Sequence, residues 1–76
     1  MQAMTISLTQ VTEVQDFVNL VSRFPFEVDI VSGRYTVNAK SLLGIYSLDL
    51  SRPLQALIYS DDCAELLEAL EAFSGK

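Results

Sequence analysis

The chain opens with alternating apolar and polar residues. Met4, Ile6 and Leu8 are separated by Thr5 and Ser7. A period of two is typical of a strand with one buried face, so we expect a first strand here.

The next apolar residues have the spacing of a helix. They stand three and four residues apart, at Val14, Phe17, Val18 and Val21. This spacing predicts an amphipathic helix with one buried face. Thr12 and Gln15 have the spacing of a capping box, so we expect the helix to begin at Thr12. Pro25 limits its length, because the residue before a proline avoids helical geometry.

A hairpin is expected after this helix. Phe26, Val28 and Ile30 alternate with acidic residues, and Tyr35 and Val37 alternate with polar ones. A two-residue turn at Ser32-Gly33 can join the two strands, because glycine readily adopts a positive φ.

In the second half of the chain, the pattern of apolar residues, caps and proline predicts a helix, a strand and a last helix. Ser41 to Leu48 is a short helical segment in which Ser41 suits the N-cap. Pro53 separates it from a strand at Leu54 to Tyr59. Ser60-Asp61-Asp62 then supplies a cap and negative charge for a last helix, with Cys63 buried in its first turn and Gly75 at its end. The apolar face of this helix consists of Leu66, Leu67, Leu70 and Phe73.

The order of elements is βαββαβα, which predicts a single α+β domain over residues 1–76. Four strands with helices crossing between them favour an antiparallel sheet with three helices on one face. The other face is expected to be solvated, because its residues are largely threonine, serine and acids.

Charge and hydropathy exclude several classes of function. Ten acidic and five basic residues give a net charge of −5, and the basic residues are scattered. We therefore expect no direct nucleic-acid binding, which needs clustered positive charge. No apolar run approaches the ~20 residues of a membrane helix. The first residues also lack the features of a signal peptide, so we expect a cytoplasmic protein.

The chain contains no histidine and one cysteine. Ser-His and Cys-His catalysis, imidazole acid–base chemistry and histidine-ligated metal sites are therefore impossible within it. No nucleophile stands beside a base in the pattern of a known reaction. We expect no enzymatic activity, no metal and no cofactor.

The segment from Val37 to Leu48 resembles HPr, the histidine phosphocarrier of the bacterial sugar phosphotransferase system. It reads Val-Asn-Ala-Lys-Ser-Leu-Leu-Gly-Ile-Tyr-Ser-Leu, and it has the family's Lys-Ser, two bulky apolar residues, Gly, an aliphatic residue and Ser-Leu. The resemblance runs from about Phe17 to Phe73. It implies the HPr-like open-faced sandwich.

The same resemblance places Gln10 at the family's phosphohistidine. Thr12 then stands at the position of the arginine that neutralises phosphate, and Glu13 at that of a proline. A glutamine amide is no nucleophile, and Glu13 adds negative charge where an anion should sit. We therefore expect that histidine phosphotransfer has been lost.

With a glutamine at the histidine position, the chain is similar to the catabolite-repression HPr-like paralogues. Those proteins keep a regulatory serine. Ser41 is the matching serine, and the resemblance implies HPr serine kinase and a LacI-type repressor as partners. Phosphate would meet the positive end of the short helix. The alternative is that Ser41 is only an N-cap.

Docking residues also follow from the resemblance. With Ser41 as the cap, Ile45 and Leu48 point inward, and an outward apolar patch remains at Leu42, Leu43 and Tyr46. The family uses such a patch for partner proteins, and Lys40 lies beside it. The alternative is that the three residues belong to the core. Gly44 indicates a close approach, either by a partner or by a neighbouring segment of the chain.

We therefore predict a non-catalytic HPr-like regulatory protein with a switch at Ser41. The rival hypothesis is a diverged interaction or dimerisation module without phosphorylation. A homodimer is compatible with either, because the sheet has an exposed edge strand.

Overall fold

The computed structural model describes residues 1–74 and has seven regular helices and strands. They follow the order β1 (Gln2–Ile6), α1 (Val11–Val21), β2 (Val28–Ser32), β3 (Tyr35–Asn38), α2 (Leu42–Tyr46), β4 (Leu54–Ile58) and α3 (Ala64–Leu70). A short 3-10 helix, η1 (Glu71–Phe73), continues α3. The order confirms the predicted βαββαβα chain.

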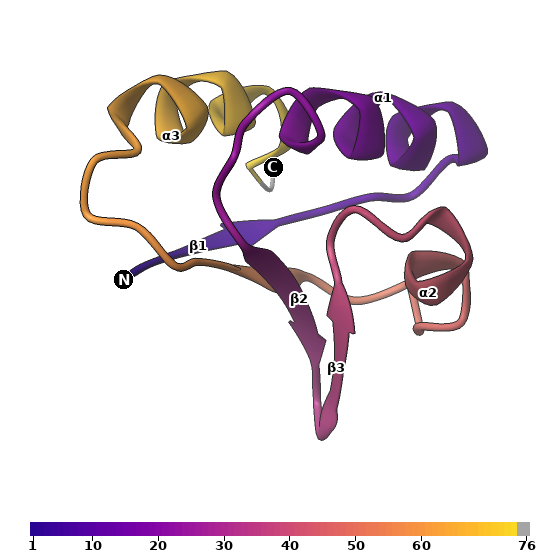
Figure 1. The fold of residues 1–76 in the computed structure, drawn as a ribbon. Helices are drawn as coiled ribbons and strands as arrows, with labels where there is room; N and C mark the ends of the chain where they lie inside the picture. The colour runs from indigo at the N-terminus through magenta and orange to yellow at the C-terminus, as the bar shows by residue number, and fades with distance from the viewer. Residues whose placement is uncertain (75–76) are drawn as a thin grey trace.

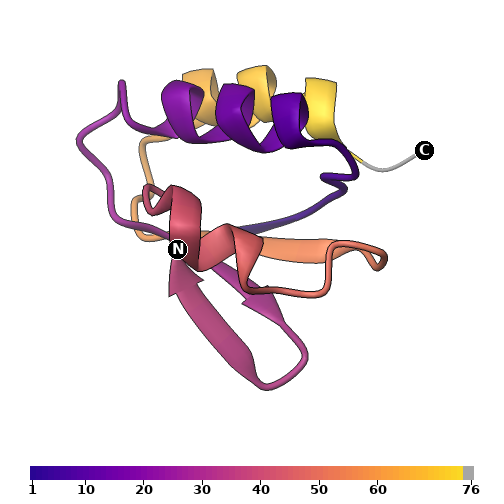
Figure 2. The ribbon, with the colours of Figure 1, turned by 90° about the vertical axis from the view of Figure 1, so that its right-hand side faces the viewer.

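The four strands form one antiparallel sheet in the order β1-β4-β2-β3. Figures 1 and 2 both show α1 and α3 above the sheet, and the two helices are in contact. α2 packs against both α1 and β3. The predicted α+β fold, with a four-stranded antiparallel sheet and three helices, is confirmed.

The core lies between the sheet and the helices. Alternate residues of the central strands are fully buried, among them Ile30 of β2 and Ala56 of β4, which are paired. Phe17 of α1 packs edge-to-face on Phe73, with 5.7 Å between the ring centroids and 86° between the rings. This contact joins the two long helical segments above the sheet.

The opposite face of the sheet is largely polar, as expected. The Gln55 amide of β4 donates to the Thr5 hydroxyl of β1 at 2.9 Å. The Tyr59 hydroxyl donates to the Asp29 carboxylate at 3.1 Å, and this bond raises the pKa of Tyr59. Cross-strand polar pairs of this kind stabilise a solvated sheet face modestly.

Helix α1 begins earlier than predicted. Its N-cap is Gln10, with an extended backbone at φ −123° and ψ 154°, and not Thr12. Glu13 reaches back to accept a hydrogen bond from the Gln10 backbone N–H at 3.1 Å. The capping interaction therefore belongs to the pair Gln10 and Glu13, and the prediction of Thr12 with Gln15 is wrong.

The hairpin turn also lies one residue later than predicted. Ser32 pairs with Tyr35, so the two central residues are Gly33 and Arg34. Gly33 has φ +60°, which a side chain would strain. The first strand was expected from Met4 to Leu8, and β1 runs from Gln2 to Ile6. The next strand was expected to include Phe26, but β2 begins at Val28.

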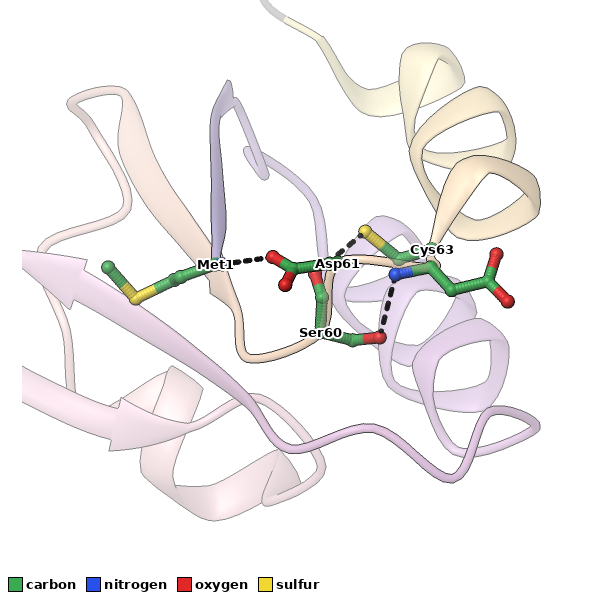
Figure 3. Close-up of polar contacts among 5 residues, drawn as sticks. Met1, Ser60, Asp61 and Cys63 are labelled. Carbon is green, nitrogen blue, oxygen red and sulfur yellow. Dashed lines mark hydrogen bonds and ion pairs between the residues drawn. The ribbon is translucent and has the colours of Figure 1, made fainter.

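Helix α3 begins after the predicted cap. Its N-cap is Cys63, so Cys63 is buried as expected but precedes the first turn. The Ser60 hydroxyl accepts from the Asp62 N–H at 3.1 Å, and the Cys63 thiol donates to the Ser60 carbonyl at 3.4 Å (Figure 3). This local turn uses the polar groups that were expected to start the helix. The predicted end at Gly75 lies outside the described residues.

The start of β1 is tied to the loop before α3. The Met1 amino group donates to the Asp61 carboxylate at 2.9 Å (Figure 3). That hydrogen bond, together with the positive charge of the amino group, holds the pKa of Asp61 below its ordinary value. Both groups are exposed, so the pair contributes little to stability.

Candidate functional site

Ser41 is the N-cap of α2, as predicted. Its side-chain oxygen accepts a hydrogen bond from the Gly44 N–H at 3.1 Å. Its carbonyl accepts from the Ile45 N–H at 3.1 Å, which starts the helix. Ser41 is half-buried, so part of the residue is exposed while its side chain caps the helix.

Gly44 is needed because the cap is tight. A Cβ placed on Gly44 would lie 3.0 Å from the Ser41 Oγ and 3.3 Å from the Val37 Cβ. The glycine is therefore explained by a contact within the chain. Of the two explanations considered for Gly44, the structure favours the internal one.

Gly44→Ala should destabilise the fold slightly despite the better helix propensity of alanine. Overpacking costs about 1–3 kcal/mol, while Gly→Ala in a helix gains about 1 kcal/mol. Urea unfolding should therefore show a net loss, whereas Leu43→Ala at an exposed neighbour should change little. A Gly44→Ala protein that is more stable than wild type would contradict the tight cap.

The apolar residues of α2 differ in exposure. Ile45 is fully buried, as predicted, and Leu43 is 81% exposed. Leu42 and Tyr46 are half-buried and pack partly against the core. The three residues of the predicted patch therefore form a surface, named the α2 surface here, in which Leu43 is the most prominent member.

Another exposed apolar residue stands at the start of α1. Val11 is the first residue of α1 and is 60% exposed. In Figure 1, α2 lies beneath the N-terminal half of α1, and the two helices are in contact. Sequence reasoning missed Val11, because a helix that starts at Thr12 leaves it outside the regular structure.

Lys40 has a structural partner. Its ammonium group donates to the Phe24 carbonyl at 2.8 Å, and its backbone N–H donates to the Asn38 side chain at 2.8 Å. The side chain therefore ties the segment before α2 to the loop after α1. Lys40 as a partner-binding residue stays a prediction.

The loop between β1 and α1 carries a carboxylate at the start of the helix. The Glu13 carboxylate accepts from the Thr9 N–H at 2.8 Å, the Thr9 hydroxyl at 2.9 Å and the Gln10 N–H at 3.1 Å. Backbone N–H groups at a helix N-terminus are the groups that bind an external anion. Glu13 therefore occupies the N–H of the N-cap Gln10 and places its negative charge at the start of the helix.

The charge around this loop is negative. The hydrogen bond from the Thr9 N–H, then those from the Thr9 hydroxyl and the Gln10 N–H, hold the pKa of Glu13 below its ordinary value. Residues 1–22 contain no lysine or arginine. A pocket of about 300 Å³ beside the loop is lined by Ser7, Thr9, Glu13, Ala72, Phe73 and Ser74. Its one charged lining residue is an acid.

Glu13→Gln should change how the stability of the fold depends on pH. A lowered pKa in the folded state means that the ionised form is stabilised by folding. That stability is present above about pH 4.5, the ordinary glutamate value, and is lost as the pH falls through the folded pKa. Urea midpoints should therefore differ between wild type and Glu13→Gln at neutral pH and converge in acid. A constant difference across that range would contradict the assignment.

No group of three or more potential metal ligands lies together in residues 1–74. In the same part of the chain, no helix has the length and apolar character needed to cross a membrane.

Comparison with known proteins points to one family. A family model described as the PTS HPr component phosphorylation site matches residues 10–75. The solved structure of the phosphocarrier protein HPr from Bacillus anthracis is 31% identical, with a TM-score of 0.74 over 97% of this chain and 94% of that one. No match was found among curated protein sequences.

Two further structures are similar. HPr-C-His from Thermoanaerobacter tengcongensis is 28% identical, with a TM-score of 0.80 over 95% of this chain and 89% of that one. The histidine-containing phosphocarrier protein of Mycoplasma is 12% identical, with a TM-score of 0.76 over 93% and 89%. At that identity the Mycoplasma protein supports the fold alone.

Proposed function

This chain belongs to the HPr phosphocarrier family of the phosphotransferase system, and we propose that it is a non-catalytic member that regulates by binding proteins. The observation that carries the proposal is the loop between β1 and α1. There the Glu13 carboxylate accepts hydrogen bonds from the Thr9 and Gln10 N–H groups, and the chain contains no histidine.

The loss of phosphotransfer rests on three features of this loop. Gln10 stands where the family's phosphohistidine is expected, and the lone pair of its amide nitrogen is delocalised. Thr12 supplies no positive charge in place of the expected arginine. Glu13 adds a negative charge at the start of α1, which repels phosphate, and its carboxylate already accepts from the N-cap N–H of Gln10. Restoring a histidine alone would leave the other two obstacles in place.

Protein binding is assigned to the α2 surface. Leu43 is 81% exposed, and it lies beside Leu42 and Tyr46 on one short helix. An exposed apolar group on a small domain is a candidate hot spot when its neighbours exclude water around it. The proposed occupants are an HPr serine kinase and a LacI-type repressor.

Ser41 is the proposed switch at this surface. Phosphate on its hydroxyl would add about −1.5 to −2 charges beside the N–H groups of α2. The Gly44 N–H, which now binds the Ser41 oxygen at 3.1 Å, is within reach of such a group. Because the chain has a net charge of −5, the partner must provide basic side chains.

The test is phosphorylation followed by a binding measurement. The whole chain and Ser41→Ala are incubated with HPr serine kinase and ATP, with ordinary HPr as the positive control, and intact mass is measured. One phosphate on wild type and none on Ser41→Ala is expected. Repressor binding should then appear only with the phosphorylated chain. Absence of phosphate while HPr is modified would overturn the switch.

A constitutive binding module is the second candidate, and two contacts favour it. The Ser41 oxygen already serves as the helix cap, and the Lys40 ammonium is held by the Phe24 carbonyl. Both groups therefore have structural roles without any phosphate. Partner binding by the unmodified chain, unchanged in Ser41→Ala, would support this candidate over the switch.

A further inference from the structure

The β2–β3 hairpin carries an exposed aromatic residue at its end. The hairpin projects away from the helices, with its turn farthest from them (Figure 1). Tyr35 follows the Gly33-Arg34 turn and is 67% exposed. Arg34 is exposed as well, and it makes no ion pair with any of residues 1–74. Tyrosine and arginine are among the residue types enriched at the hot spots of protein interfaces.

A pocket with complementary character lies elsewhere in the molecule. It has a volume of about 430 Å³ and lies between the loop after α1 and the loop before α3. Phe24, Pro25 and Phe26 give it an apolar wall, in which the two phenylalanine rings stack with 5.9 Å between centroids. Pockets of about 300–1,000 Å³ with aromatic walls accommodate groups of the size of a substituted ring.

The rim of this pocket is acidic. Asp62 and Glu65 line it, and both are exposed. The segment from Asp61 to Glu71 holds five of the ten acidic residues of the chain. At the hairpin end, Arg34, Tyr35, Arg52 and Asp49 line one groove, and Arg52 pairs with Asp49 at 3.9 Å, which leaves the Arg34 charge without a partner among residues 1–74. The hairpin end therefore offers one positive charge, Arg34, beside the Tyr35 ring, and the other end offers an aromatic pocket with an acidic rim.

These two surfaces cannot meet within one molecule. Figures 1 and 2 both show the hairpin end well separated from the loops that form the pocket. A second copy of the chain supplies each surface with a partner of opposite charge. We propose that Arg34 and Tyr35 of one copy dock into the Phe24–Phe26 pocket of another.

In this contact the Tyr35 ring packs on Phe24 and Phe26, and Arg34 faces Asp62 and Glu65. Different surfaces meet on the two copies, so the association is head-to-tail and gives rings or open chains. The charged pairs lie at an exposed rim, so added salt weakens the association. The contact uses none of Ser41, Leu43 and Tyr46, and it is independent of the proposed function.

Sedimentation velocity of the full chain over a concentration series tests the proposal. At low salt the sedimentation coefficient should rise with concentration, and added salt should reverse the rise. Tyr35→Ser and Arg34→Glu should each weaken self-association by roughly 30-fold, the effect of losing an interface hot spot. Leu43→Ser is the control, and it should associate like wild type.

A mixing experiment separates this contact from any other. Asp62→Arg/Glu65→Arg should be monomeric alone, and so should Arg34→Glu. Mixed together, they should associate, because the wild-type hairpin of one variant meets the wild-type pocket of the other, and the reversed hairpin meets the reversed pocket. Circular dichroism checks that these exposed substitutions leave the fold unchanged. A chain that stays monomeric throughout, or association that persists in Tyr35→Ser and Arg34→Glu, would overturn the proposal.

Discussion

Leu43→Asp is expected to abolish partner binding while leaving the fold intact. Leu43 is 81% exposed, so a charge there stays solvated in the free protein. In a complex the same charge would be buried against the partner without compensation, which is strongly unfavourable. We expect at least about 30-fold weaker binding, the range of a lost hot spot.

The measurement is titration of the phosphorylated chain into a LacI-type repressor by calorimetry. Tyr59→Ser is the matched control, because Tyr59 is another exposed aromatic residue, 46% exposed, on the far side of the sheet. It should bind like wild type. In urea, Leu43→Asp should unfold within about 0.5 kcal/mol of wild type, and Tyr59→Ser should lose about 0.2–1 kcal/mol with its bond to Asp29. Unaltered binding by Leu43→Asp would contradict partner binding at the α2 surface.

Phe17→Ala is expected to have the largest effect on stability. Phe17 is fully buried and packs edge-to-face on Phe73. Removing a buried phenylalanine side chain costs about 3–5 kcal/mol through lost burial and the cavity that remains. A domain of this size has a total stability of only about 4–11 kcal/mol. Phe17→Ala should therefore lose much of its stability and unfold at far lower urea concentration.

Urea unfolding followed by circular dichroism measures this loss. If Phe17→Ala does not fold, Phe17→Leu gives a smaller loss that remains measurable. Val18→Ala serves as a neighbour on the same helix that is only partly buried, and it should lose much less. Equal losses in Phe17→Ala and Val18→Ala would contradict the packing described for α1.

The fold could be predicted from periodicity because most elements bury alternate or helically spaced residues. Val14, Phe17 and Val21 of α1 are fully buried, as their spacing indicated. The same holds for Leu54, Ala56 and Ile58 in β4. Hydrophobic spacing fixes which face of an element is buried, but it says little about where the element begins.

The element ends were harder to predict because local hydrogen bonds compete. Thr12 is a better N-cap by residue type, yet Glu13 can reach Thr9 and Gln10 only if the helix starts at Val11. In the hairpin, glycine takes the first central position of the turn, where φ is positive. Both choices depend on geometry that residue preferences alone do not contain.

The candidate site was predicted in part. Ser41 as N-cap followed from its residue type and is confirmed. The tight packing of Gly44 on Ser41 and Val37 could not be derived from spacing, because it depends on how α2 meets β3. Leu42 and Tyr46 are half-buried rather than fully outward, since a five-residue helix packed against α1 and β3 has little free surface.

The central claim is that this family member no longer carries phosphate at the β1–α1 loop. The direct test is transfer of labelled phosphate from phosphorylated enzyme I, with ordinary HPr as the working control. Three proteins are compared: wild type, Gln10→His, and Gln10→His/Thr12→Arg/Glu13→Pro. No label is expected on the first two and label is expected on the third, because Glu13 and the missing positive charge block the restored histidine. Label on the wild-type chain, or equal labelling of Gln10→His and the triple variant, would contradict it.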